Sequence, residues 1–160
     1  GYTHKTKYIP PIAPSPNLPN ITAIYLYPLL CLTEGTVLSC GRGTDFPFQV
    51  VGHPKFKPKD FSFTPRSIEG ASKNPPHKNI LCYGTDLRTF SVKNITRLPL
   101  EIFIDAYNNY EGSDPFFTPF MLKVAGTAEL QKQLEQGMSA EKIRNSWKKD
   151  LESFMKIRKK

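Results

Sequence analysis

Proline is the residue that most limits what this chain can fold into. The sequence contains 15 prolines among 160 residues, and twelve of them lie at or before Pro76. Proline lacks a backbone N–H and restricts the residue before it to extended conformations, so it interrupts both helices and central strands. We therefore expect an irregular first half made of turns and short strands, with the regular helices in the second half.

A glycine-rich stretch from Glu34 to Gly52 stands out within the irregular half. Its four glycines permit positive φ or the close approach of another group, and polar side chains are spaced closely between them. The residues from Phe46 to Val51 are mostly apolar and predict a strand that fixes the end of this loop. This combination is typical of a ligand-binding loop.

The polar groups of the stretch define a candidate substrate-binding site. Several hydroxyls, one arginine and one carboxylate suit an oxygen-rich ligand that itself carries a carboxylate. The candidate residues are Glu34, Thr36, Ser39, Arg42, Gly43 and Thr44. The alternative is a structural loop in which Arg42 pairs with Glu34 or Asp45. The stretch matches neither a phosphate-binding loop nor a dinucleotide fingerprint, because Gly-Lys-Ser/Thr and a third glycine are missing.

Residues 20–32 are apolar almost throughout and predict a buried helix, with Asn20 or Thr22 as its N-cap; a strand over 21–27 is the alternative. A helix would bring Glu34 to the negative end of a helix dipole. Glu34 would then need a positive partner, and Arg42 is the nearest in sequence.

The remaining pattern predicts strands first and helices afterwards. Short strands are expected at 46–51, 61–64, 79–83 and 85–92, the last two separated or bent at Gly84. Helices are expected after Pro99, Thr127 and Ser139, and the aromatic loop 114–120 is expected to pack in the core. The packing stripe of the last helix is Ile143, Trp147, Leu151 and Phe154. The fold class is therefore α+β: a small irregular, partly barrel-like sheet with C-terminal helices packed on it.

The net charge of +8 is unevenly distributed. Residues 139–160 carry eight Lys/Arg and three Asp/Glu, whereas residues 61–138 carry eight of each. A basic terminal helix without interleaved aromatics is weak evidence for nucleic-acid binding, so we expect no nucleic-acid partner; an anionic cell-wall polymer is as reasonable a ligand.

Cysteine and histidine spacing predicts no metal and no cofactor. Three cysteines cannot all pair within the chain, no CxxC occurs, and the three histidines are far apart, so buried free thiols are expected. The longest apolar run, 21–32, is too short to span a bilayer. The sequence shows no signal peptide, and its opening residues look like the middle of a protein.

Five short motifs occur in one order along nearly the whole chain. They are Pro14-Ser15-Pro16-Asn17-Leu18-Pro19, Leu26-Tyr27-Pro28, Cys31-Leu32-Thr33-Glu34-Gly35-Thr36, Gly41-Arg42-Gly43-Thr44 with Pro47-Phe48, and Ser146-Trp147 with Asp150-Leu151 and Phe154. In these motifs the chain resembles the C-terminal half of a bacterial family, formerly of unknown function, that includes exo-β-N-acetylmuramidases. The family often has Asn where Val37 stands, so no role of that amide can be transferred.

The resemblance implies a two-part enzyme of about twice this size. An N-terminal Rossmann-like half would be the partner and carry the catalytic carboxylate, residues 1–19 would be an extended connector, and residues 20–160 a single cleft-lining domain. The activity would be hydrolysis that releases terminal N-acetylmuramic acid from peptidoglycan fragments during cell-wall recycling, in the periplasm or outside the cell. The catalytic residues stay unassigned here, and the isolated chain should be inactive. The alternative is a non-catalytic module that binds cell wall or carbohydrate, or completes a partner's fold.

Overall fold

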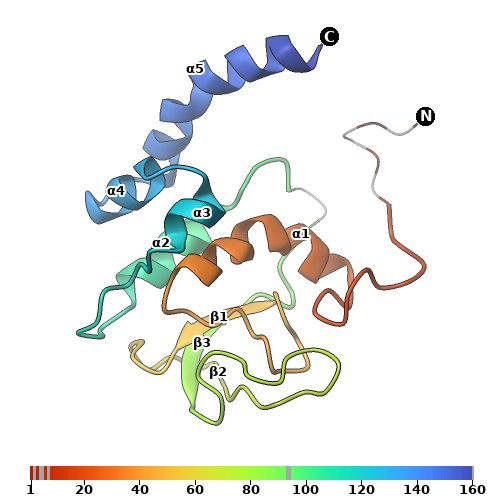
Figure 1. Cartoon of the computed structure of the whole chain (residues 1–160), viewed down its shortest axis with the longest axis vertical. Coiled ribbons are helices and arrows are strands. Elements are labelled where there is room, and N and C mark those ends of the chain that lie inside the picture. Colours follow the sequence, from red (N-terminus) through yellow and green to blue (C-terminus); the bar gives the residue numbers. More distant parts are fainter. Residues whose placement is uncertain (2, 4–5, 7, 93–94, 160) are drawn as a thin grey trace.

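The computed structural model describes residues 1, 3, 6, 8–92 and 95–159. Within these residues, the first half holds a helix, a 3-10 helix and two short strands among irregular segments, and the second half holds one strand and four helices (Figure 1). They are α1 (Ile21–Leu30), the 3-10 helix η1 (Cys31–Gly35), β1 (Val50–His53), β2 (Ser62–Phe63), β3 (Cys82–Asp86), α2 (Leu100–Asn108), α3 (Met121–Ala125), α4 (Glu129–Glu135) and α5 (Ala140–Arg158). The predicted α+β class is confirmed.

The three strands form an open antiparallel sheet in the order β1-β3-β2, so β1 and β2 are its edges and the strands described do not close into a barrel. Gly84 does not break β3. It pairs with Gly52, and a Cβ on Gly84 would overlap the carbonyl oxygen of Val51, so glycine lets the two backbones approach. The strand expected at 46–51 begins only at Val50, because Phe48 has a φ of 55° and residues 46–49 form a turn.

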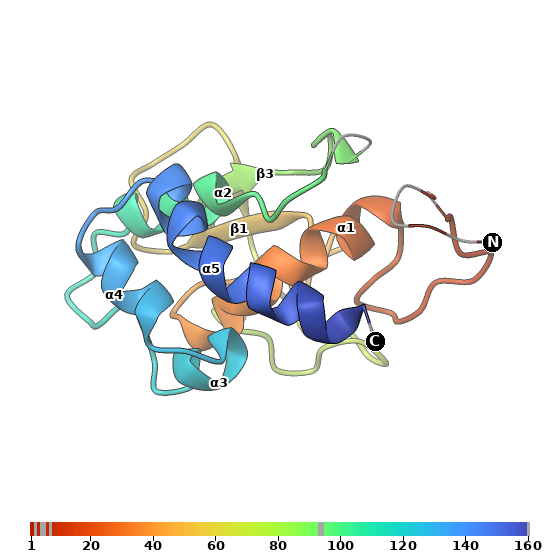
Figure 2. The same cartoon turned by 90° about the horizontal axis from the view of Figure 1, so that it is seen from above.

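The predicted first helix is confirmed and the strand alternative is excluded. Asn20 caps α1, since its Oδ1 accepts a hydrogen bond from the backbone N–H of Ala23 at 3.0 Å. Four residues of α1 are completely buried: Ala23, Leu26, Leu29 and Leu30. In Figures 1 and 2, α1 lies between the sheet on one side and α5 on the other. It is therefore the central element of the main core.

Helices α2, α4 and α5 begin within two residues of the predicted positions, whereas α3 was not predicted. Ser139 caps α5 by accepting from the backbone N–H of Lys142, and Ile143 is completely buried. Phe116 of the aromatic loop also belongs to the core, as expected. The packing stripe predicted for α5 is wrong in its second half, because the side chains of Leu151 and Phe154 are 54% and 57% exposed. None of the described helices has the length and apolarity needed to cross a membrane.

The end of the segment expected to be a connector is tied to the domain. Asn17 is buried, and its side-chain amide donates to the carbonyl oxygen of Ala71 at 3.0 Å. The backbone N–H of Leu18 donates to the carbonyl of Ser15, which closes the turn. Asn17 thus joins the turn to the long loop 64–81.

Candidate functional site

An ion pair lies at the centre of the candidate site. The Nη2 atom of Arg42 is 2.9 Å from Oε1 of Glu34, and the two side chains are 32% and 36% exposed. The guanidinium carbon of Arg42 also lies 4.9 Å from the centre of the Phe48 ring. Arg42 therefore has one partner in a carboxylate and a second in an aromatic face. Solvent reaches the side chains of Arg42 and Glu34, whereas Phe48 is buried.

The two predicted alternatives for Arg42 are thereby separated. Asp45 pairs with Arg66 instead, at 2.7 Å between Oδ1 and Nη2, and both side chains are mostly exposed. Each acid of the loop has its own arginine. Glu34 also receives the positive partner that its position after α1 requires.

The hydroxyls of the site are bound within the loop itself. Thr36 donates to the carbonyl of Thr33 and accepts from the N–H of Leu38. The Oγ1 of Thr44 donates to the carbonyl of Gly41 at 2.6 Å. All three hydroxyl residues, Thr36, Ser39 and Thr44, are buried. These groups give the loop its shape, and the part of the site that solvent reaches is Glu34 and Arg42.

The backbone of Ser39 connects the loop to the sheet. Its backbone exchanges two hydrogen bonds with Gly52, at 2.9 and 3.0 Å, and its Oγ accepts from the N–H of Gly41. Because Gly52 belongs to β1, this bridge attaches the loop to a strand. The loop is thus fixed on the scaffold, as the sequence predicts for a binding loop.

Gly43 is required for a different reason. Its φ is +81°, and a Cβ at this position would lie 2.5 Å from the carbonyl oxygen of Arg66 and 2.5 Å from Cγ of Pro75. Its carbonyl accepts a hydrogen bond from the N–H of Arg66 at 2.7 Å. Gly43 therefore packs the loop against the segment 64–81, and no larger residue fits at this position.

Two histidines that the sequence did not assign to the site lie against each other next to the loop: His77 bonds to Val37 of the loop, and His53 ends β1. His77 bonds through Nε2 to the carbonyl oxygen of Val37 at 2.7 Å, so this nitrogen carries the proton. The His53 ring centre is 4.5 Å from that of His77 and 4.9 Å from that of Tyr110. Burial, and secondly the charge of His77, lower the pKa of His53 to about 4. The two histidines are 24 residues apart in the sequence, so no local pattern could predict this contact.

Tyr27 is a second feature that the sequence left without a role. Tyr27 is 40% exposed, and its ring packs against the Phe48 ring in a T-shaped arrangement with ring centres 5.0 Å apart. Phe48 therefore contacts both Tyr27 and Arg42. A partly exposed aromatic ring such as that of Tyr27 is a surface on which a sugar ring can stack.

The predicted state of the cysteines is found for two of them. Cys40 and Cys82 are buried and Cys31 is partly buried, and all three are free thiols. Burial raises the pKa of Cys82 to about 12 and also raises that of Cys40, so both stay protonated at neutral pH. In the described part of the chain, no three His, Cys, Asp or Glu side chains gather to hold a metal ion.

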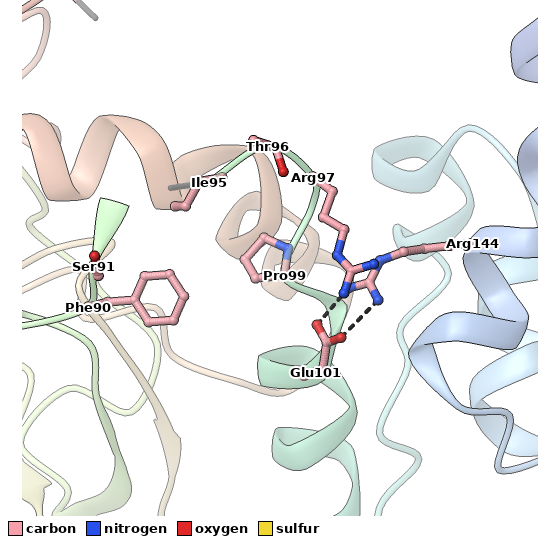
Figure 3. Close-up of a pocket in the computed structure, with 8 residues that line it drawn as sticks. All are labelled: Phe90, Ser91, Ile95, Thr96, Arg97, Pro99, Glu101 and Arg144. Carbon is pink, nitrogen blue, oxygen red and sulfur yellow. Dashed lines mark hydrogen bonds and ion pairs between the residues drawn. The ribbon is translucent and has the colours of Figure 1, made fainter. Parts of the chain in front are cut away.

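A separate pocket of 250 Å³ is lined mainly by residues 90–99, together with Glu101 of α2 and Arg144 of α5 (Figure 3). Phe90, Ile95 and Pro99 line one side, while Arg144 points at Glu101 through two hydrogen bonds of 2.8 and 2.6 Å. The Arg144 bonds lower the pKa of Glu101 to about 2. The charges of Arg144 and Glu101 neutralise each other, and the pair joins α5 to α2. None of the predicted site residues lines this pocket.

A family model described as the C-terminal region of the exo-β-N-acetylmuramidase NamZ matches residues 25–160. The chain belongs to this family. It is 33% identical, over 167 residues, to the peptidoglycan β-N-acetylmuramidase NamZ of Bacillus subtilis (strain 168), covering 95% of this chain and 40% of that protein. The resemblance expected from the five motifs is confirmed.

A solved structure gives the same result for the fold. The crystal structure of a DUF1343 family protein from Bacteroides fragilis NCTC 9343 is 51% identical to this chain and superimposes with a TM-score of 0.89. The match covers 99% of this chain and 45% of that one. The chain thus spans less than half the length of either relative.

Proposed function

We propose that this chain is the cleft-lining, C-terminal half of a glycoside hydrolase that releases terminal N-acetylmuramic acid from peptidoglycan fragments. The observation that carries the proposal is the half-exposed Arg42, bound to Glu34 and lying over Phe48. Membership of the NamZ C-terminal family supports the reaction class. An N-terminal Rossmann-like half would be the partner and would supply the catalytic carboxylate.

The chemistry of Arg42 fits a muramyl saccharide. N-acetylmuramic acid carries a lactyl carboxylate, and a guanidinium binds a carboxylate through two parallel N–H donors. Because the Glu34–Arg42 pair is partly exposed, a ligand carboxylate can approach Arg42 and share it with Glu34 without a buried charge being left unpaired. Tyr27, which also contacts Phe48, offers an aromatic face to the sugar ring.

The acid–base step is assigned to the other half. Glycoside hydrolysis usually needs two carboxyl groups on opposite sides of the bond that is cleaved. The two carboxylates of this loop, Glu34 and Asp45, are both held by arginines. Neither is placed as a free proton donor, so the role we propose for the loop is to bind and orient substrate.

A non-catalytic binding or structural module is the second candidate. The buried hydroxyls of Thr36, Ser39 and Thr44 favour it, because most of the polar groups in the motif stabilise the loop itself. The two candidates differ in what Arg42 does: it recognises a carboxylate in the first and only neutralises Glu34 in the second.

Replacing Arg42 in the longer protein tests the proposal. Arg42→Lys should raise KM for a chromogenic N-acetylmuramide about tenfold or more and spare folding, because lysine cannot reproduce the two-pronged contact. Arg66→Lys is the matched control, since Arg66 also pairs with an acid of the loop, whereas the arginine that lies over Phe48 is Arg42. An unchanged KM with a lower melting temperature for Arg42→Lys would assign the arginine to structure.

Assays of the 160-residue chain by itself give a second test. With the proton-transfer group in the other half, the purified chain should not hydrolyse the N-acetylmuramide. Turnover at the rate of the longer protein would place the catalytic group within these residues and contradict the assignment.

A further inference from the structure

The second half of α5 carries an apolar stripe that the domain leaves uncovered. The stripe begins at the fully buried Ile143 and passes the partly buried Trp147. At the same helical spacing it continues through Leu151, Phe154 and Met155, whose side chains are 54%, 57% and 44% exposed. The same face of one helix is therefore core at its start and solvent-exposed at its end.

The exposed part is too long to be an ordinary frayed end. From Lys148 to Lys159 every residue is exposed, although α5 stays helical to Arg158. A helical segment of about 12 residues is marginal in water unless an apolar face is packed. A shallow hollow of 470 Å³ also lies along the stripe, between Leu151, Met155 and four charged residues. Both features indicate a surface that another part of a protein covers.

The charges around the stripe describe what would cover it. Residues 148–159 carry five basic side chains (Lys148, Lys149, Lys156, Arg158 and Lys159) and two acidic ones (Asp150 and Glu152), a net charge of +3. A second copy of this chain would bring the same positive charge to the contact. An apolar surface rimmed with carboxylates complements both the stripe and its border.

The position of this surface indicates where its partner comes from. In both views the end of α5 and the segment 8–19 that precedes α1 project on the same side of the molecule (Figures 1 and 2). The two relatives are more than twice as long, and the matched family is a C-terminal region. Their additional polypeptide would therefore enter the domain on the side of the uncovered stripe.

We infer that the distal face of α5, defined by Leu151, Phe154 and Met155, is the surface on which the N-terminal half of the longer protein docks, through an apolar patch bordered by carboxylates. The inference rests on the two-part architecture of the proposed function and is independent of muramidase chemistry. Docking would place α5 in contact with both halves and so fix their relative position across the substrate cleft.

Trypsin cleavage tests this, because the exposed segment is rich in its target residues. In the 160-residue chain, cleavage after Lys148, Lys149 and Lys156 should be fast. In the longer protein, cleavage at the same bonds should be at least tenfold slower. The N-acetylmuramide assay is not part of the readout, so loss of the proposed activity and loss of docking are measured separately.

Paired variants show whether the stripe causes the protection. In the longer protein, Leu151→Glu combined with Phe154→Glu should restore fast cleavage. Ser153→Glu adds a charge on the opposite side of the same helix and should leave the bonds protected. Since these side chains are exposed in the isolated chain, the variants should not lower its melting temperature, which separates lost docking from misfolding.

Four results would overturn the inference. Equal cleavage rates in the chain and in the longer protein would show that the face stays uncovered. Dimers of the 160-residue chain in sedimentation velocity, lost in the double variant, would make a second copy the occupant. Binding of the longer protein to vesicles of anionic phospholipid, abolished by the double variant, would assign the face to a membrane surface. A gene with no N-terminal half would exclude it directly.

Discussion

Secondary structure and burial go together in opposite ways in two regions, the loop from Glu34 to Gly52 and the distal part of α5. Most of the loop has no regular structure, yet its hydroxyls are buried and bonded to its own backbone. The distal part of α5 is a regular helix, yet all of its side chains are exposed. The loop is specified by contacts that are already present, whereas the helix carries a surface without a counterpart. Buried polar groups that are hydrogen-bonded, rather than regular secondary structure, distinguish the loop from the uncovered face of α5.

The largest expected effect is at Gly43. Gly43→Ala should lower the free energy of unfolding by about 3 to 4 kcal/mol, because alanine combines an unfavourable positive φ with overlap against Arg66 and Pro75. Gly70→Ala is the control: Gly70 has a φ of +74° but nothing within 4 Å of its Cβ position, so only about 1 kcal/mol should be lost. Urea denaturation of both variants measures the difference. Equal losses would mean that the loop does not depend on packing against segment 64–81.

The next effect separates the two halves of α5. Ile143→Ala should cost about 3 kcal/mol, because Ile143 is completely buried and the change leaves a cavity. Leu151→Ala should cost less than about 0.5 kcal/mol in the 160-residue chain, because this leucine is mainly exposed. Thermal unfolding of the chain checks both values. A loss of more than about 1 kcal/mol for Leu151→Ala would show that the distal face already packs within the chain.

A third prediction concerns the support behind the loop. The Nδ1 atom of His53 accepts a hydrogen bond from the N–H of Lys55 at 2.8 Å, and protonation would remove this acceptor. Because the folded pKa of about 4 lies below the ordinary value of 6.5, the folded state binds fewer protons between these pH values. The free energy of unfolding should therefore be highest above pH 6.5 and fall by about 2 to 3 kcal/mol as the pH drops to about 4.

His53→Gln is the matching variant, since glutamine keeps an oxygen acceptor but does not titrate. Urea denaturation between pH 7.5 and 4 should give a flatter profile for the variant than for the wild-type chain. Profiles of the same slope would assign the acid sensitivity to other groups.

The sequence predicted those features that depend on short-range pattern. Helix α1 and the Ser139 start of α5 follow from apolar spacing and capping chemistry. For the cap of α1 and the acid that pairs with Arg42, the sequence left two candidates each, and the structure selects Asn20 and Glu34. The burial of Thr36, Ser39 and Thr44 could not be predicted from the sequence. A hydroxyl that binds a ligand and one that binds its own loop look alike in sequence.

Long-range contacts account for the remaining differences. The contact of His53 with His77 depends on how a long loop returns to the strand, and no periodic signal encodes it. The stripe on α5 was read as core over its full length, because core and docking surfaces share the same helical spacing. A pattern shows that a face will be covered, but it does not show by what.

The smallest expected effect, and the most direct test of the comparison, is in amide hydrogen exchange over residues 34–48 and 148–158. In the loop, the N–H groups of Thr36, Ser39 and Phe48 already donate to backbone carbonyls, so their protection should be substantial in the 160-residue chain. If the loop faces the N-terminal half across a cleft, the longer protein should add up to about tenfold protection there, equivalent to about 1.4 kcal/mol. The distal part of α5 should gain more, because it starts with exposed side chains and no packing. Equal protection of residues 34–48 in both proteins would show that the loop is self-contained, and the candidate site would then not lie at the boundary of the two halves.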